Sequence, residues 1–166
     1  MQKKVETDMP LGVVGERFQA GGYGDTKFLT SSSATIGTVV TQDPSQENGC
    51  VVGGTGPFLG IIGLPKSYPM NNDYEVEFTL PTQALKNGQE VNYYSTGTVQ
   101  VKASTPVDIK VVAKVFYDNT TGILGQGSSV PAGSTEIPAR FIHRSGDAGT
   151  VVVVDLLEGF CEPASS

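Results

Sequence analysis

Short apolar runs separated by glycine and proline fill residues 53–103, and they constrain the fold more than any other feature of the chain. The stretch opens Gly-Gly-Thr-Gly-Pro-Phe-Leu-Gly-Ile-Ile-Gly-Leu-Pro-Lys-Ser-Tyr-Pro and later reads Leu-Pro-Thr-Gln-Ala-Leu-Lys-Asn-Gly-Gln-Glu-Val. Each apolar run has the length of a strand, and Pro or Asn-Gly marks the turns between the runs. Because no segment keeps a helical period over three turns, the pattern predicts a β fold.

Composition supports the same fold class. The 166 residues include 21 Gly and 10 Pro, and only 17% are charged. Val, Thr, Ile, Tyr and Phe supply most of the bulk, as in pleated sheets. We therefore predict an all-β chain that forms a single-domain antiparallel β-sandwich, jelly roll or small barrel. Nine strands are expected, at residues 34–41, 50–52, 58–62, 73–80, 90–94, 98–103, 109–117, 137–143 and 150–157.

The connections and limits of the domain follow from the same pattern. Residues 90–94 and 98–103 are predicted to pair with each other around a turn at 95–97. One helical turn is expected at residues 83–86, a loop at 125–134, and an irregular, glycine-crowded segment at 13–29. The predicted organisation is an extended N-terminal arm (1–12), a β domain (13–159) and a loose C-terminal tail (160–166).

Charge and cysteine content exclude several classes of protein. The net charge is −6 with only 11 Lys and Arg, which disfavours nucleic acid as a partner. The sequence shows neither a signal peptide nor a run of about 20 apolar residues, so we expect no membrane contact and synthesis in a reducing cytoplasm. Two reduced thiols are favoured for Cys50 and Cys161, although a disulfide between them stays open.

No catalytic constellation is evident. The glycine-rich residues 54–60 superficially resemble a phosphate-binding loop, but Pro57 removes a backbone donor and β residues follow where a helix should begin. The single histidine, His143, has no identifiable orienting partner and is expected to be a surface or interface residue. Glu75 and Glu77 would share one face of a strand, about 6.6 Å apart, yet the alternation predicts two solvated carboxylates.

No metal or cofactor site is predicted either. The carboxylates Asp73, Glu75, Asp108 and Asp118 are scattered along the chain and match no calcium-binding loop. We therefore predict a non-enzymatic protein without metal or cofactor.

Three segments carry a resemblance to a known family. They are Leu-Gly-Val-Val-Gly-Glu-Arg-Phe at 11–18 leading to Ala-Thr-Ile-Gly-Thr-Val-Val at 34–40, Phe-Leu-Gly-Ile-Ile-Gly-Leu-Pro-Lys-Ser-Tyr at 58–68, and Leu-Pro-Thr-Gln-Ala-Leu-Lys-Asn-Gly-Gln-Glu-Val at 80–91 continuing to Gly-Thr-Val-Gln-Val. In these segments the chain resembles the structural cement, or head decoration, proteins of tailed double-stranded DNA phages. The likeness covers most of residues 11–157.

The resemblance implies a function. Cement proteins bind the outer surface of the expanded capsid, often as dimers or trimers, and bridge subunits of the major capsid protein. We therefore expect a homo-oligomer, a trimer or dimer, on the virion surface. Contacts are expected from the arm (1–14) and from loops around 65–72 and 125–133. The individual contact residues predicted are Met9, Pro10, Leu11, Pro65, Lys66, Tyr68 and Tyr74.

Two other functions fit the same β pattern. A carbohydrate-binding or adhesin-like module would present exposed aromatic rings. The chain has no Trp, so that role would fall to the tyrosines Tyr68, Tyr74, Tyr93 and Tyr94. Another virion subunit, such as a tail-tube protein, shares the fold class but would polymerise. An esterase or glycosidase is the enzymatic alternative that the sequence favours least.

Overall fold

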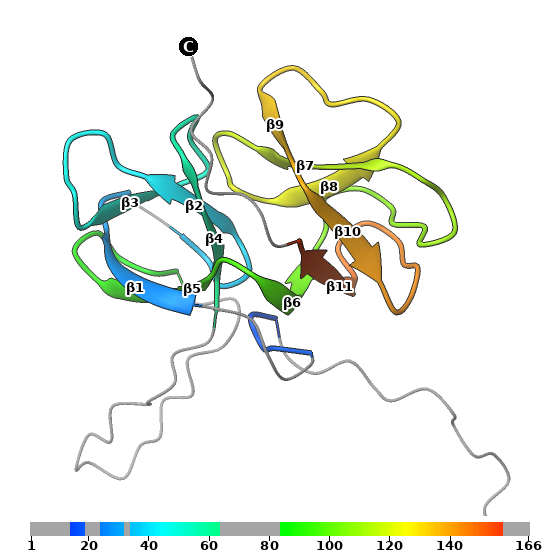
Figure 1. The fold of residues 1–166 in the computed structure, drawn as a ribbon, viewed down its shortest axis with the longest axis horizontal. Helices are drawn as coiled ribbons and strands as arrows, with labels where there is room; N and C mark the ends of the chain where they lie inside the picture. Colours follow the sequence, from blue (N-terminus) through cyan, green and yellow to red (C-terminus); the bar gives the residue numbers. More distant parts are fainter. Residues whose placement is uncertain (1–13, 19–23, 32–33, 64–83, 158–166) are drawn as a thin grey trace, which may run out of the picture.

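The computed structural model describes residues 14–18, 24–31, 34–63 and 84–157 of the chain. The regular elements of this part are strands, without a helix, so the all-β prediction is confirmed (Figure 1). None of the described residues forms a helix long and apolar enough to cross a membrane. The strands are β1 (Gly24–Leu29), β2 (Val39–Gln42), β3 (Gly49–Val52), β4 (Phe58–Ile62), β5 (Glu90–Tyr94), β6 (Gly97–Lys102), β7 (Lys114–Asp118), β8 (Leu124–Gly127), β9 (Ser134–Ile137), β10 (Ala139–Ile142) and β11 (Val151–Leu156).

The first five strands form a closed barrel in the order β1-β3-β2-β4-β5. Its pairs are antiparallel except β1 with β3, which run parallel where Phe28 lies opposite Gly49. The barrel closes between β1 and β5, whose register runs from Gly24 opposite Tyr94 to Phe28 opposite Glu90. Closure leaves few free strand edges in this part of the fold.

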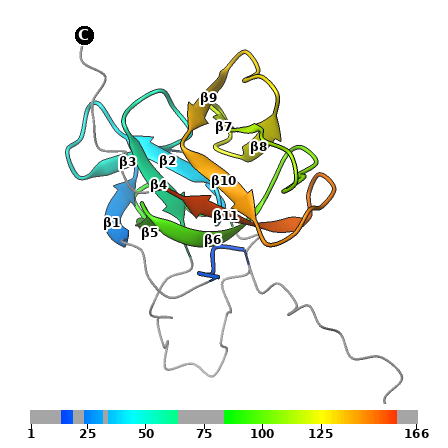
Figure 2. The same cartoon turned by 45° about the vertical axis from the view of Figure 1, so that its right-hand side comes forward.

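The remaining strands form two three-stranded sheets, β10-β11-β6 and β8-β7-β9. The chain passes from one sheet to the other at Pro138, directly between β9 and β10, and Figure 2 shows these two strands as one continuous path. The predicted strands at 137–143 and 150–157 correspond largely to β10 and β11, which pair antiparallel from Ala139 opposite Leu156 to Ile142 opposite Val153.

Two hydrophobic clusters follow from the alternation of side chains along the barrel strands. Val40, Ile62 and Tyr93 belong to a barrel core, whereas their neighbours Val39 and Ile61 belong to a core shared with the two sheets. The barrel core comprises Val14, Leu29, Ala34, Ile36, Val40, Cys50, Ile62, Leu85, Val91 and Tyr93. The shared core adds Tyr94 and residues of β6 to β11, including Val99, Val101, Val115, Tyr117, Leu124, Phe141, Val152 and Val154.

A joint made of main-chain groups connects the barrel to the sheet β8-β7-β9. Within the barrel, the Gly53 N–H donates to Val39 O at 2.9 Å. Across to the sheet, the Val39 N–H donates to Gly122 O at 2.8 Å, and the Gly54 N–H donates to Asn119 O at 2.7 Å. The buried Tyr117 hydroxyl donates to Gly54 O at 3.0 Å. The glycine-rich segment is therefore a tight connection leading into β4, as the sequence indicated, and not a phosphate loop.

Residues 14–18 add a further strand-like segment to the edge of β6. The Gly15 N–H donates to Gln100 O at 2.7 Å, and the Gln100 N–H donates to Glu16 O at 2.9 Å. Side chains fix the same segment, since the Arg17 guanidinium lies 4.4 Å from the centre of the Tyr94 ring. This edge of the sheet is thereby covered by the chain itself.

Two strand predictions were wrong for identifiable reasons. Residues 90–94 and 97–102 are strands, but they do not pair with each other, because β5 uses both edges for β1 and β4 while β6 pairs with β11. The predicted strand at 109–117 begins only at Lys114. The preceding residues turn instead, because the Asp108 side chain accepts a hydrogen bond from the Lys110 N–H at 2.9 Å.

Smaller differences concern the loops. The predicted loop at 125–134 contains most of β8, which pairs with β7, and the start of β9. Leu85 forms an antiparallel bridge with Ala34, and residues 84–86 do not form the predicted helical turn. β1 lies in the segment that was predicted to be irregular. Much of this strand faces solvent, so it lacks a clear apolar pattern, and its hydrogen bonds come from the distant strand β5. The predicted strand at 73–80 lies outside the described residues.

Candidate interaction surface

The loop before β7 exposes three large aliphatic side chains. Val112 is fully exposed, Val111 is 56% exposed and Ile109 is 39% exposed. Single exposed apolar residues are common on protein surfaces, but a group within four residues is typical of a contact surface. We call Val111 and Val112 the valine tip.

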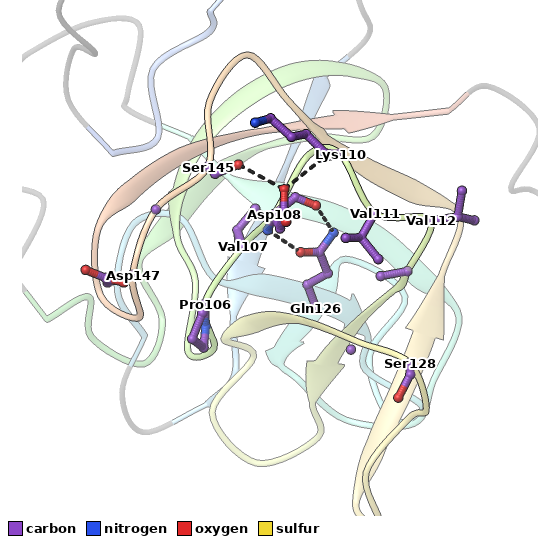
Figure 3. A pocket seen from close by; sticks show the side chains of 13 residues that line it. Pro106, Val107, Asp108, Lys110, Val111, Val112, Gln126, Ser128, Ser145 and Asp147 are labelled. Carbon is purple, nitrogen blue, oxygen red and sulfur yellow. Dashed lines mark hydrogen bonds between the residues drawn. The ribbon is translucent and has the colours of Figure 1, made fainter.

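A hydrogen-bond network around Asp108 holds the base of this loop. The Asp108 N–H donates to Gln126 Oε1 at 2.7 Å, and Gln126 Nε2 donates to Asp108 O at 3.2 Å. Ser145 Oγ donates to Asp108 Oδ1 at 3.3 Å and accepts from the Ile109 N–H at 3.2 Å. Figure 3 shows Asp108 between Gln126 and Ser145, with Val112 at the far end of the loop. The tip is therefore presented from a base tied to two other segments.

An open hollow of about 670 Å³ lies beside the tip. Three segments line it, residues 106–108 with 110–113, 126–128 and 145–147 (Figure 3). Its polar side chains belong largely to the network just described, while Val107 and Val111 contribute apolar surface. Part of the loop predicted to make contacts, 125–133, thus lies here, in the form of Gln126, Gly127 and Ser128.

Sequence reasoning missed the valine tip because it assigned the apolar run 109–117 to a strand. Val and Ile have high β propensity, but that preference depends on packing against neighbours. The signal that could have found the loop is Asp108, which follows Pro106 and precedes the valines. Aspartate commonly accepts a hydrogen bond from the backbone two residues onward and so favours a turn.

The other predicted contact residues cannot be placed on this surface. They lie outside the described residues: Met9, Pro10, Leu11, Pro65, Lys66, Tyr68 and Tyr74. Glu75 and Glu77 lie outside them as well.

Two tyrosines considered for sugar binding are buried in the two cores. Tyr93 is 5% exposed and Tyr94 is 7% exposed. They cannot offer a ring face to a glycan, which corrects their assignment as exposed aromatic residues. The reason is that both lie on β5, whose two faces are covered by the barrel core and the shared core.

Local structure explains the shifted pKa values of Cys50, Asp118 and Asp43. Burial raises the pKa of the Cys50 thiol to about 11, so this free cysteine is neutral at physiological pH. Hydrogen bonds from the backbone N–H groups of Thr121 and Thr120, in the turn after β7, lower the pKa of Asp118 at the end of that strand. Hydrogen bonds from Ser45 and Thr30 lower the pKa of Asp43.

His143 occupies the surface position that the sequence predicted. It has φ of 79°, and its ring lies 4.5 Å from that of Phe18, measured between centroids. The left-handed backbone directs this exposed ring onto the segment that covers β6.

Comparison with known proteins identifies the family. The sequence matches the structural cement protein family (E217 gp24/Pam3 gp6) over residues 1–157. The chain belongs to this family. It is therefore a structural protein of the phage virion.

Solved structures and curated sequences show more distant likenesses. A chain in the solved capsid of Myoviridae phage XM1 has the same fold, with a TM-score of 0.58, 14% identity and 95% of both chains covered. The head fiber gp8.5 N base of bacteriophage phi29 gives a TM-score of 0.47, with 9% identity over 85% of this chain and 98% of that one. The genome polyprotein of Bovine enteric calicivirus NB is 28% identical over 137 residues, 74% of this chain. The match spans only 6% of the polyprotein's length.

Proposed function

We propose that this cement protein decorates the outer surface of the phage head and stabilises it by bridging subunits of the major capsid protein. The observation that carries the proposal is the exposed aliphatic group Ile109, Val111 and Val112, held on a hydrogen-bonded base in a chain of this family. Such a surface suits binding to another protein, where apolar burial supplies most of the free energy.

Charge supports the outer surface rather than the interior. The net charge of −6 opposes proximity to packaged DNA, because Lys and Arg number only 11. Nucleic acid is accordingly not a partner in this proposal. The protein acts as a small homo-oligomer, a dimer or trimer, and without catalysis.

Binding to undecorated heads tests the proposal. Expanded heads lacking this protein are mixed with the purified chain, sedimented, and analysed for bound copies per head. We expect saturable binding at a fixed stoichiometry and a higher temperature of head disruption. Fully decorated heads serve as the control and should take up no more protein. Absence of both binding and stabilisation would refute the proposal.

Light scattering after size exclusion separates this function from that of a tube subunit. A decoration protein remains a dimer or trimer as its concentration rises, whereas a tube subunit forms long polymers. Polymerisation of the isolated chain would therefore favour the tail-tube alternative.

A further inference from the structure

We propose that the valine tip, Val111 and Val112, is an anchor that inserts into an apolar socket on the capsid shell. This inference rests on the proposed function and assigns it a binding element. The tip joins two aliphatic side chains at the end of a loop, where neither contacts a core of the described chain. Exposure of aliphatic surface to water is unfavourable, so burial of the tip in an apolar socket lowers the free energy of the complex.

The base of the loop makes the tip an efficient anchor. Gln126 exchanges two hydrogen bonds with the Asp108 backbone, at 2.7 and 3.2 Å, and Ser145 adds two more contacts to the same loop. A group already fixed in its bound arrangement loses little conformational entropy on binding. Gln126 is therefore a positioning residue for the tip.

The size of the tip favours a shell over a second copy as the occupant. A stable interface buries about 800 Å² on each partner, far more than two valines supply. On a shell the protein has other contacts, and the tip then binds at a high effective concentration. An isolated pair of copies in solution would lack that advantage.

The charges near the tip indicate the chemistry of the socket. Asp108 and Lys110, of opposite sign, precede the valines, and after Ala113 the charge of Lys114 is paired with Glu136 at 2.7 Å. A socket that matches this element is apolar and carries little net charge. Its contribution to binding should therefore change little with salt concentration.

The test compares head binding by the wild-type chain and by the double variant Val111→Ser, Val112→Ser. Because the tip is exposed, the variant should unfold at the wild-type temperature. We expect its affinity for undecorated heads to fall on the order of 100-fold, at both low and high salt. The matched control is Phe28→Ser, which removes another exposed apolar side chain, on β1 of the barrel, and should change affinity less than about 3-fold.

Gln126→Ala tests the positioning role. It should weaken binding in the wild-type background but cause no further loss in the tip double variant, because the two changes act through the same contact. A purely structural role would weaken both proteins equally. Equal losses would therefore overturn the positioning assignment.

The outcomes separate the two proposals. If the wild-type chain does not bind heads, both the function and the anchor are refuted. If the wild-type chain and the tip variant bind heads equally well, the function stands and the anchor is wrong. If the tip changes instead dissociate a dimer or trimer in solution while head binding per protomer is unchanged, the occupant is a second copy and the shell assignment is overturned.

Discussion

Replacing Gly53 by alanine tests whether the main-chain joint determines the stability of the fold. Gly53 has φ of 63°, a left-handed backbone that alanine adopts at a cost of about 1–2 kcal/mol. A Cβ at this position would lie 2.5 Å from Asn119 O and 2.8 Å from Asn119 C. These are backbone atoms, so the joint must shift to admit the methyl group.

A second glycine with a left-handed backbone separates the steric part of this destabilisation from the backbone strain. Gly88 has φ of 82°, yet a Cβ there would meet nothing within 4 Å. Gly88→Ala therefore costs only the backbone strain, about 1 kcal/mol. Gly53→Ala adds the steric shift and weakens the bond from Gly54 to Asn119, for a total of about 3 kcal/mol. The changed entropy of the unfolded chain is the same in both variants and cancels in the comparison.

Urea unfolding of the two variants measures this difference. The chain lacks Trp but has 6 Tyr, so tyrosine fluorescence and circular dichroism report the transition. We expect Gly53→Ala to be less stable than Gly88→Ala by about 2 kcal/mol, or by about 4–8 °C in melting temperature. Equal stabilities of the two variants would show that the close approach at the joint is not a constraint.

Three further predictions concern single side chains. Raising the pH from 9 to 11 should lower the free energy of unfolding by about 2 kcal/mol, because the buried Cys50 thiol keeps its proton up to about pH 11 while the unfolded thiol loses it. Cys50→Ala should flatten this slope in pH-dependent urea titrations, and an unchanged slope would contradict the cause. His143→Gly should be more stable than His143→Ala by about 1 kcal/mol. Both variants lose the contact with Phe18, but only glycine adopts the left-handed backbone at this position without strain. Equal melting temperatures of the two variants would contradict the presence of backbone strain at His143. Tyr117→Phe should cost about 1–2 kcal/mol by leaving Gly54 O without its hydroxyl donor, and wild-type stability in urea would contradict this.

Many single strands were predictable from the sequence, but their pairing was not, because the one predicted pair, 90–94 with 98–103, does not form. The strands around 137–143 and 150–157 were found because each is a short apolar run and a polar turn joins them. The pairing of β1 with β5, and the parallel contact of β1 with β3, join segments far apart in sequence. No turn signal marks such pairs, and β1 lacks the alternation of a strand with one clearly buried face.

The candidate surface was only partly predictable for a related reason. Glycine and serine predicted a loop at 125–134, which in fact contains most of β8, but Gln126 to Ser128 of this segment do line the hollow. The valines at 111 and 112 were assigned to a strand because apolar side chains are usually buried. Their exposure depends on two hydrogen bonds that only the folded chain brings together: the Asp108 N–H donates to Gln126, and the Ser145 hydroxyl donates to the Asp108 carboxylate.

The closure of the barrel by β1 and β5 also affects how the protein folds while it is being made. β1 emerges from the ribosome well before β5, whose last residue, Tyr94, pairs with Gly24. Until then the first four strands have an unpaired edge, which can join to the same edge of another nascent chain. Slower translation before residue 94, or a chaperone that holds the early strands, should therefore change the yield of soluble protein more than the same intervention after that point.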